Sequence, residues 1–319
     1  MIKSMAVLTS GGDSPGMNAA IRAVVRTGLK HNLKMYMVSF GFKGLVDGSI
    51  KMADRDSVKD IINRGGTIIG STRLPEFKEL AVQQKAIDNL RKHKIDSLVC
   101  IGGDGTYQGA LALSRLGFPT VALPATIDND VASTDYTIGF DTCLNTIIDC
   151  IDKLRDTTSS HQRCSLIEVM GRQCGDLAIF SGIAEGVELV MDYTHRPEEV
   201  DIIKILSELK RKKKRHAIML VSENLVDVHE LADHITQETG FETKAEVLGR
   251  LQRGGSPTAF DRVLASRLGS RAAEILIRGQ SGRCIGMVNN QIRDYDIEES
   301  LTLKKPDRTA LYQLLDTLK

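Results

Sequence analysis

Three turns in the sequence carry carboxylates, and the first two also contain glycines; these residue types together are suited to binding and transferring phosphoryl groups. The turns are residues 9–18, 101–106 and 123–130. Glycine lets the backbone come close to a ligand, and a helix that follows offers N–H groups and a partial positive charge to phosphate oxygens. Carboxylates supply hard oxygen ligands for Mg²⁺ or a base for a hydroxyl proton. The turns therefore predict phosphoryl-transfer chemistry.

The first turn contains Gly11, Gly12 and Asp13 after an apolar run and before a helical pattern. It is not a Walker loop, because Met17 stands where the lysine would be, and it lacks the spacing of a dinucleotide-binding G-x-G-x-x-G loop. A polyphosphate cradle of another kind is one interpretation. A tight strand-to-helix turn without a ligand is the other.

The second turn places Asp104 among three glycines, Gly102, Gly103 and Gly105. Asp104 on so bare a backbone is suited to holding Mg²⁺ while the surrounding N–H groups bind phosphates. Asp104 could instead cap the following helix, although a cap alone does not require glycine on both sides.

The third turn carries two carboxylates, Asp128 and Asp130. A calcium loop is excluded, because Ser133 and Gly139 stand where that loop needs glycine and glutamate. One carboxylate could take a hydroxyl proton while a neighbour positions the metal or the base. A solvated turn without a catalytic role is the alternative.

Basic residues near these and later turns could offset the charge of a phosphoryl group in transfer. Arg22 and Arg26, four apart on the first expected helix, form a separate basic pair on one helix face. The run 210–216 is either a second anion site or a solvated helix end. The candidate cations for the turns are Arg73, Arg163, Arg172, Lys244, Arg250 and Arg253.

Length and composition indicate two ordinary globular domains. The chain has 319 residues, 42% of them hydrophobic, with a formal net charge of +1. So small a charge gives no electrostatic argument for a nucleic-acid or membrane partner. Six cysteines without a C-x-x-C pair and no export signal predict buried thiols in a cytoplasmic protein, and the histidine spacing predicts no zinc site.

Short apolar runs alternate with helical patterns along the chain. Such alternation predicts parallel sheets covered by helices on both faces, with ligands at the carboxyl ends of the strands. The expected helices include 18–29, 80–91 and 141–155. The expected strands lie near 5–9, 35–39, 97–101, 119–123, 165–169, 187–191, 217–221 and 285–288.

Taken in order, these motifs resemble those of bacterial ATP-dependent 6-phosphofructokinases over essentially the whole chain. A single G-G-D-G-T would be only suggestive, because lipid kinases and NAD kinases contain something similar. Seven motifs in register are specific. They are residues 8–13, 61–67, 102–106, 126–130, 154–157, 169–172 and 252–257.

The resemblance implies phosphorylation of O1 of fructose 6-phosphate by MgATP, a regulated step of glycolysis. Asp128 would be the base, Thr126 and Arg172 would steady the phosphoryl group, and Asp104 would bind Mg²⁺. The implied ATP contacts are Gly12, Arg73, Leu74, Gly103, Asp104, Gly105 and Thr106. The implied substrate contacts are Thr126, Ile127, Asp128, Arg163, Met170, Gly171, Arg172, Glu223, Lys244, Arg250, Leu251, Gln252 and Arg253.

The resemblance also implies a fold, an assembly and a second ligand site. The fold would be two Rossmann-like three-layer α/β/α domains with mainly parallel sheets: an ATP-binding domain of residues 1–138 and 251–301, and a sugar-phosphate domain of residues 139–250 and 302–319. The assembly would be a homotetramer with shared active sites, and ADP or GDP and phosphoenolpyruvate would be effectors. The implied effector residues are Arg22, Arg26, Arg55, Asp60, Arg155, Gly186, Val187, Glu188, Lys212, Lys214, Arg215 and His216.

Some positions depart from the family pattern. Gly105 and Ala125 favour ATP over pyrophosphate, because pyrophosphate-using relatives resemble G-G-D-D with a lysine at the second position. Phe42 and Leu74 stand where tyrosine and phenylalanine are commoner in the family, which predicts weaker stacking on the nucleotide. In the sugar-phosphate pocket, Lys244 replaces arginine and Arg250 replaces histidine. Two alternatives remain. Lys244 and Arg250 favour a kinase for a related sugar phosphate such as tagatose 6-phosphate. A non-catalytic phosphosugar or nucleotide sensor would be expected to lack Asp104, Asp128 or Arg172, and all three are present.

Overall fold

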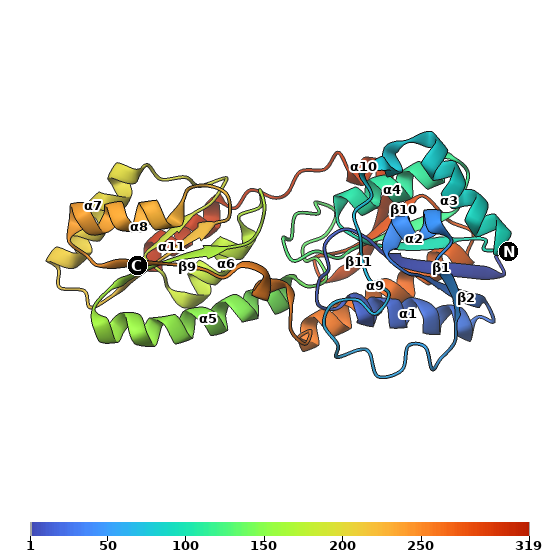
Figure 1. Ribbon diagram of the computed structural model, residues 1–319, viewed down its shortest axis with the longest axis horizontal. Helices are drawn as coiled ribbons and strands as arrows, with labels where there is room; N and C mark the ends of the chain where they lie inside the picture. The colour runs from blue at the N-terminus through green and yellow to red at the C-terminus, as the bar shows by residue number, and fades with distance from the viewer. Residues whose placement is uncertain (1, 319) are drawn as a thin grey trace. The chain divides into compact units, whose positions relative to one another are not determined.

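The computed structural model describes residues 2–318, and the chain forms two compact units. Unit 1 contains Met1–Thr142 and Arg253–Lys305, and unit 2 contains Cys143–Gln252 and Pro306–Lys319 (Figure 1). The chain therefore passes between the units three times, where crossings near 139, 251 and 302 were expected.

Unit 1 is built on a seven-stranded sheet with the order β11-β10-β5-β4-β1-β2-β3. The five central strands are parallel, and the edge strands β3 and β11 are antiparallel to their neighbours. The strands are β1 (Ser4–Thr9), β2 (Lys34–Val38), β3 (Ile50–Ala53), β4 (Leu98–Gly102), β5 (Thr120–Pro124), β10 (Arg283–Val288) and β11 (Gln291–Asp296).

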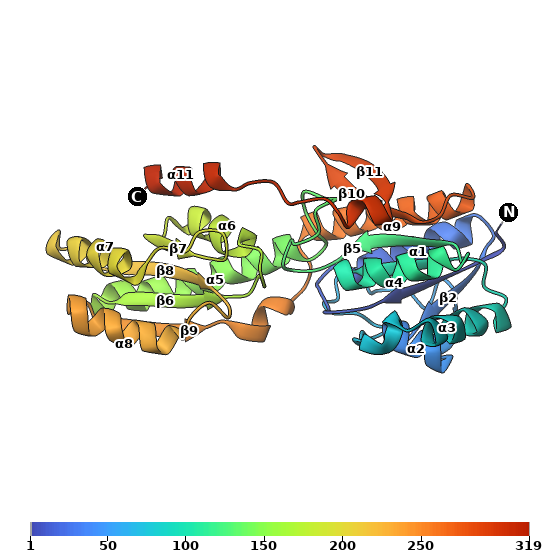
Figure 2. The same cartoon turned by 90° about the horizontal axis from the view of Figure 1, so that it is seen from above.

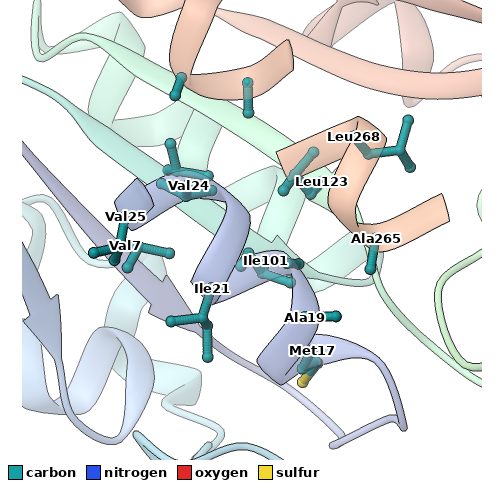
Figure 3. Packing of buried hydrophobic residues seen from close by; sticks show 14 of the residues in the cluster. Val7, Met17, Ala19, Ile21, Val24, Val25, Ile101, Leu123, Ala265 and Leu268 are labelled. Carbon is teal, nitrogen blue, oxygen red and sulfur yellow. The ribbon is translucent and has the colours of Figure 1, made fainter. Parts of the chain in front are cut away.

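Helices cover both faces of this sheet. Alternate residues of β1 point to opposite faces, so Val7 packs with α1 and α9, whereas Leu8 packs with α2, α3 and α4 (Figures 2 and 3). The helices are α1 (Met17–Lys30), α2 (Gly41–Asp47), α3 (Leu80–Lys92), α4 (Asp104–Arg115), α9 (Ala259–Ile277) and α10 (Ile297–Ser300), with a 3₁₀ turn η1 (Pro75–Lys78).

Unit 2 has a four-stranded, wholly parallel sheet with the order β7-β8-β6-β9. α7 and α8 pack on one face of it. On the other face Val190 lies against Gly182 of α6, and Thr158 of α5 shares a 2.6 Å hydrogen bond with Ser165 of β6. The elements are α5 (Phe140–His161), β6 (Cys164–Val169), α6 (Asp176–Glu185), β7 (Leu189–Met191), α7 (Glu199–Arg211), β8 (Ala217–Ser222), α8 (Val228–Thr239), β9 (Thr243–Val247), η2 (Gly249–Arg253) and α11 (Thr309–Leu318).

The structure confirms the predicted fold class and every strand expected from an apolar run. Three strands were missed, β3, β9 and β11, and all three lie at sheet edges. Edge strands expose much of their surface, so β9 and β11 carry polar residues and give no apolar run.

Cys100, Cys143, Cys164 and Cys284 are buried as predicted, and Cys150 and Cys174 are half-buried. Within residues 2–318, the helices are too short or too polar to span a bilayer.

A buried carboxylate, Asp261, joins the first turns of α9 and α5 within unit 1. Its Oδ1 accepts from the N–H of Gly139 at 2.9 Å, and its Oδ2 accepts from the N–H and hydroxyl of Thr142 at 2.8 and 2.6 Å. Thr258, the N-cap residue of α9, donates to the Asp141 carboxylate at 2.5 Å. Asp261 of α9 thus caps the first turn of α5, and the Thr142 hydroxyl of α5 accepts from the Thr258 N–H before α9 at 3.0 Å. This junction lies where the chain leaves unit 1.

We expect Asp261→Ala to lower the free energy of unfolding of unit 1 by about 3 kcal/mol. The N–H groups of Gly139 and Thr142 would be left buried without this acceptor, at about 1–3 kcal/mol for each. Asp296 is a matched control, because it caps the short helix α10 in the same unit from an exposed position. Asp296→Ala should cost about 1 kcal/mol in denaturant unfolding followed by circular dichroism.

The pH dependence of this effect has a defined sign. Burial raises the pKa of Asp261 to about 6, against the opposing effect of its bonds to Thr142 and Gly139. The folded chain thus holds this proton more tightly than the unfolded chain, and stability from this group falls as pH rises from about 4 through about 6. The loss caused by Asp261→Ala should be larger at pH 5 than at pH 7.5 by roughly 1 kcal/mol. An equal loss at both pH values would contradict the account.

Candidate active site

The first two turns follow the neighbouring strands β1 and β4, where the order of the unit 1 sheet reverses. The chain continues from β1 to β2 on one side and from β4 to β5 on the other, which makes this a topological switch point. Ligands of open α/β sheets bind outside the carboxyl ends of strands at such points. The sequence therefore brings Gly12 and Asp104 to the position where this fold binds ligands.

A close backbone approach at Gly102 joins the two turns. A Cβ atom at Gly102 would lie 2.4 Å from the Ser10 carbonyl oxygen and 2.2 Å from the Thr106 hydroxyl. The Thr106 hydroxyl donates to that same carbonyl at 3.1 Å. Only glycine therefore allows the end of β4 to approach the turn after β1 so closely.

The first turn is supported by two residues from distant parts of the sequence. The Ser71 hydroxyl donates to the Gly11 carbonyl at 2.7 Å. The Arg253 guanidinium lies against Gly12, because a Cβ atom there would be 2.7 Å from its Nη1. Arg253 Nη1 also donates to the Asp13 carbonyl at 3.4 Å. A fixed positive charge thus lies beside the first turn.

The second turn opens α4 with Gly103 as the N-cap residue and Asp104 as the first helical residue. The interpretation of Asp104 as the N-cap residue is therefore wrong. Its side chain is exposed, and a Cβ atom at Gly105 would have no atom within 4 Å. A carboxylate at a helix N-terminus beside open space is suited to binding a metal–phosphate group.

The third turn lies next to the second. The Ala125 N–H donates to the Gly102 carbonyl at 3.0 Å, and a Cβ atom at Gly103 would lie 3.9 Å from Cβ of Thr126. Asp128 is only 3% exposed, so the alternative of a solvated turn is wrong for this carboxylate. The Thr126 hydroxyl is 3.3 Å from Asp128 Oδ2 and 3.2 Å from the Asp128 N–H.

Asn129 fixes the shape of this third turn. Its backbone has a φ of 52°, the left-handed region that asparagine tolerates better than most residues. Its Oδ1 accepts from the Thr137 N–H at 2.9 Å, and its Nδ2 donates to the Asp135 carbonyl at 3.1 Å. The Thr137 hydroxyl donates to the Thr126 carbonyl at 2.6 Å. The buried carboxylate of Asp128 therefore lies on a tightly bonded loop.

Unit 2 gathers a second group of predicted site residues at the carboxyl end of its sheet. The Met170 N–H donates to Gln252 Oε1 at 3.0 Å, and the Arg172 N–H donates to Glu223 Oε1 at 3.0 Å. Gly171 and Arg172 have φ values of 134° and 52°. Burial and the nearby Glu223 raise the pKa of Glu168, which lies near the end of β6, the strand that leads into this turn. This turn after β6 can present polar groups and a cation to a hydroxylated ligand.

Arg163 and Lys244 lie at the opposite end of the unit 2 sheet. Arg163 immediately precedes β6, and Lys244 pairs with the second residue of that strand. Both side chains approach Glu242, at 2.9 and 3.5 Å. The length of β6, roughly 20 Å, separates them from the Met170 turn. Arg250 and Leu251 follow β9 in η2, and both are exposed.

Two expectations about the nucleotide side need correction. Phe42, considered for stacking on the nucleotide, is 4% exposed and stacks on Phe77 with ring centroids 4.2 Å apart. It is a core residue, and Leu74 packs against the same cluster. Arg73, a candidate cation for the turns at the strand ends, does not follow a strand directly: it lies exposed in the long connection between β3 and η1.

The predicted effector residues of unit 2 form a mixed cluster of charges. Arg155 pairs with Glu185 at 3.0 Å, Lys214 pairs with Glu188, and Glu188 Oε2 accepts from the Ile218 N–H at 2.6 Å. Burial lowers the pKa of His216, which lies 3.5 Å from Arg155. Lys212, Lys214 and Arg215 lie in the connection after α7, and Gly186, at the end of α6, precedes Val187.

The remaining effector candidates belong to unit 1. Arg22 and Arg26 share one face of α1, and burial together with the neighbouring Arg26 lowers the pKa of Arg22. Arg55 and Asp60 are exposed. Two like charges held on one helix face favour an anionic partner.

Sequence reasoning missed Ser71 and Asn18, which hold the loops around the first turn. Asn18 Nδ2 donates to the Arg64 carbonyl at 2.9 Å, and its Oδ1 accepts from the Ile68 N–H at 2.7 Å. Asn18 ends the first turn, which was considered for Gly11 and Gly12, and Ser71 lies two residues before Arg73, which was considered as a cation. Small polar residues beside such glycines were the available signal.

Comparison with known proteins gives one consistent result. The family model described as Phosphofructokinase matches residues 4–276. ATP-dependent 6-phosphofructokinases of Vibrio campbellii and Aliivibrio fischeri are 53% and 52% identical to the chain, over 100% of both sequences in each case. The structure of phosphofructokinase from Saccharomyces cerevisiae matches with a TM-score of 0.90 and 31% identity, covering 98% of this chain and 50% of that one. The chain spans about half the length of that yeast protein.

These matches cover the glycine-containing turns of unit 1 and the turn after β6 in unit 2. They also cover the whole chain at an identity well above the level at which only a fold is shared. The chain belongs to the phosphofructokinase family.

Proposed function

We propose that this chain is an ATP-dependent 6-phosphofructokinase, which transfers the γ-phosphoryl group of MgATP to O1 of fructose 6-phosphate and releases ADP. One observation carries the proposal: the turns after β1, β4 and β5 converge, and they place the buried Asp128 next to Thr126 and the Gly103 turn. The identity to curated enzymes of that name over the full chain supports the choice of reaction.

The three turns would share the work on the nucleotide. Gly12 and residues 103–106 would bind the phosphates through backbone N–H groups, and Arg73 and Leu74 would contact the rest of ATP. Mg²⁺ fits here, because it is commonly bound by one or two carboxylates together with substrate phosphates, and Asp104 is an exposed carboxylate at a helix N-terminus. Bound there, the ion would neutralise phosphate charge. Gly105 and Ala125 favour ATP over pyrophosphate.

Asp128 would take the proton of O1 as the phosphoryl group leaves ATP. Thr126 bonds to Asp128 on the same loop and would help to steady the transferring group. Arg172 would offset its developing charge. Catalysis of phosphoryl transfer depends mainly on such positioning and charge stabilisation, since the protein has little covalent chemistry to perform.

The sugar phosphate would be bound by the residues gathered at the Met170 turn, with Ile127 and Arg253 from unit 1. These are Met170, Gly171, Glu223, Leu251 and Gln252, with Arg250 nearby in η2. In a homotetramer, Arg163 and Lys244 would contact the 6-phosphate of the sugar that is bound in the active site of a neighbouring subunit. Their separation from the Met170 turn along β6 supports that assignment. Unit 1 would thus be the ATP-binding domain and unit 2 the sugar-phosphate domain.

At an interface between subunits, the charged cluster of unit 2 and, in unit 1, Arg22, Arg26, Arg55 and Asp60 would form the effector site. It would bind ADP or GDP as activator and phosphoenolpyruvate as inhibitor. The ion pairs of Arg155 and Lys214 with Glu185 and Glu188 support it, because an incoming anion could replace these internal partners. The enzyme would act in the cytoplasm.

A coupled assay that varies fructose 6-phosphate, with and without ADP and phosphoenolpyruvate, tests the proposal. We expect saturable activity with fructose 6-phosphate that responds to both effectors. Higher kcat/KM with tagatose 6-phosphate would favour the related kinase, a possibility raised by Lys244 and Arg250. Absence of turnover with any phosphosugar would favour a sensor and overturn the proposal.

We expect Asp128→Asn to lower kcat by about 10²- to 10⁴-fold, because an amide cannot accept the O1 proton. KM for both substrates should change little. Asp135→Asn is the control: Asp135 accepts from the Asn289 N–H at 2.8 Å on the same connection and has no proposed role in chemistry. Near-normal turnover of Asp128→Asn in steady-state kinetics would refute the mechanism.

We expect Gly105→Ala to fold normally and yet to bind MgATP about 10- to 100-fold more weakly. Its methyl group would meet no protein atom, but it would enter the space assigned to the nucleotide, and overpacking costs about 1–3 kcal/mol. Gly102→Ala is the matched control, since its methyl group would clash with Ser10 and Thr106 and should lower the melting temperature. Unchanged affinity of Gly105→Ala in titration calorimetry would place the nucleotide elsewhere.

A further inference from the structure

Two residues at and within the start of α11, Arg308 and Tyr312, bond to two buried aspartates of the same unit, and both aspartates adjoin the segment that follows the Met170 turn. Unit 2 consists of Cys143–Gln252 and Pro306–Lys319, so α11 returns to it after the chain has completed unit 1. Figure 2 shows α11 beside α6, and the two helices are in contact. α6 begins at Asp176, four residues after Arg172.

The first contact is a bidentate ion pair between Arg308 and Asp176. Arg308 Nε donates to Asp176 Oδ1 at 2.9 Å, and Nη2 donates to Oδ2 at 2.7 Å. The Asp176 side chain is 3% exposed, so the pair is largely shielded from water. A two-pronged bond of this kind fixes the orientation of the carboxylate as well as its position. The first residue of α6 is therefore held by the residue that immediately precedes α11.

The second contact runs from Tyr312 to Asp192. The Tyr312 hydroxyl donates to Asp192 Oδ2, and burial raises the pKa of Tyr312, so the hydroxyl keeps its proton at neutral pH. Asp192 Oδ1 accepts from the N–H groups of Thr194 and His195 at 2.7 and 3.0 Å. A Cβ atom at Gly175 would lie 2.3 Å from Asp192 Oδ2. The backbone at Gly175 is thus packed directly against the carboxylate that Tyr312 holds.

The segment between Arg172 and Asp176 needs such support. Arg172 has a φ of 52°, and a residue with a side chain adopts this conformation at an energetic cost. The Cys174 N–H donates to the Gly171 carbonyl at 2.9 Å, so the whole segment is one compact turn. Movement of Gly175 or Asp176 would be transmitted along this turn to Arg172 and Gly171.

We propose that Arg308 and Tyr312 are positioning residues for the reaction: through Asp176 and Asp192 they hold the turn that carries Met170, Gly171 and Arg172. The inference rests on the proposed function, because it is that function which assigns the sugar and phosphoryl contacts to this turn. Arg308 and Tyr312 touch the supporting carboxylates and have no assigned contact with substrate.

The test is steady-state kinetics of Tyr312→Phe, which removes one hydroxyl and keeps the ring that stacks on His195 at 4.5 Å. We expect kcat/KM for fructose 6-phosphate to fall about tenfold, since a small misplacement of a positioning group is costly, with KM for MgATP unchanged. Arg308→Met should also lower kcat/KM for fructose 6-phosphate, and the value for Arg308→Lys should lie between those of Arg308→Met and the wild type. A purely structural role would lower the active fraction and leave both KM values unchanged.

Leu315→Ala is the matched control, because Leu315 is a buried apolar residue of α11 whose side chain has no group that could bond to Asp176 or Asp192. It should lower the melting temperature without changing KM for fructose 6-phosphate. An equal effect of Leu315→Ala and Tyr312→Phe on that KM would overturn the assignment to the two polar residues. Identical kinetics of Tyr312→Phe and the wild type would overturn it as well.

Hydrogen exchange separates failure of this inference from failure of the proposed function. Tyr312→Phe should speed exchange of the amides of residues 170–176 and leave those of residues 102–106 unchanged, whether or not the wild type phosphorylates fructose 6-phosphate. A wild type without that activity would refute the proposed function alone. Unchanged exchange in residues 170–176 would refute the inference alone.

Discussion

The close approach of two backbones at Gly102 is the constraint on which the candidate site depends. The end of β4 lies so near the turn after β1 that a single methyl group at Gly102 would overlap Ser10 and Thr106. That approach brings the N-termini of α1 and α4 toward one position, and the Gly102 carbonyl also accepts the N–H of Ala125, which starts the third turn. One glycine therefore sets the spacing of all three turns, and with it the distance between the phosphate side and Asp128.

The two sides of the site are built differently, and the difference follows from their tasks. The Gly103–Gly105 turn is exposed and bare, as a backbone must be if it is to receive a charged ligand. Asp128 is buried on a loop locked by Asn129 and Thr137, as a base must be if its position is to be fixed before the substrate arrives. In unit 2, side chains likewise fix the backbone of a turn at the strand ends: Glu223 and Gln252 accept from N–H groups of the Met170 turn.

Much of this arrangement was predictable from the sequence because its signals are local. Each central strand is an apolar run, and each ligand turn of unit 1 places a carboxylate directly after such a run, with glycines beside it in the first two turns, so fold class and turn positions followed. The burial of Asp128 was not predictable, since Asn129 and Thr137 fix it through bonds that the local pattern does not encode. Phe42 was placed with the nucleotide on resemblance, whereas its packing on Phe77, 35 residues away, makes it core. The edge strands, Asp261 and α11 depend likewise on contacts between distant segments.

The central claim is that this chain moves the γ-phosphoryl group of ATP to O1 of fructose 6-phosphate. ³¹P NMR of the protein with Mg²⁺, ATP, pyrophosphate and fructose 6-phosphate in one tube tests it most directly. The account predicts that the γ-phosphate resonance of ATP declines as a new phosphomonoester resonance, coupled to the C1 protons of the sugar, grows, while pyrophosphate stays constant. Consumption of pyrophosphate, or loss of the γ-phosphate without a C1 ester, would contradict it.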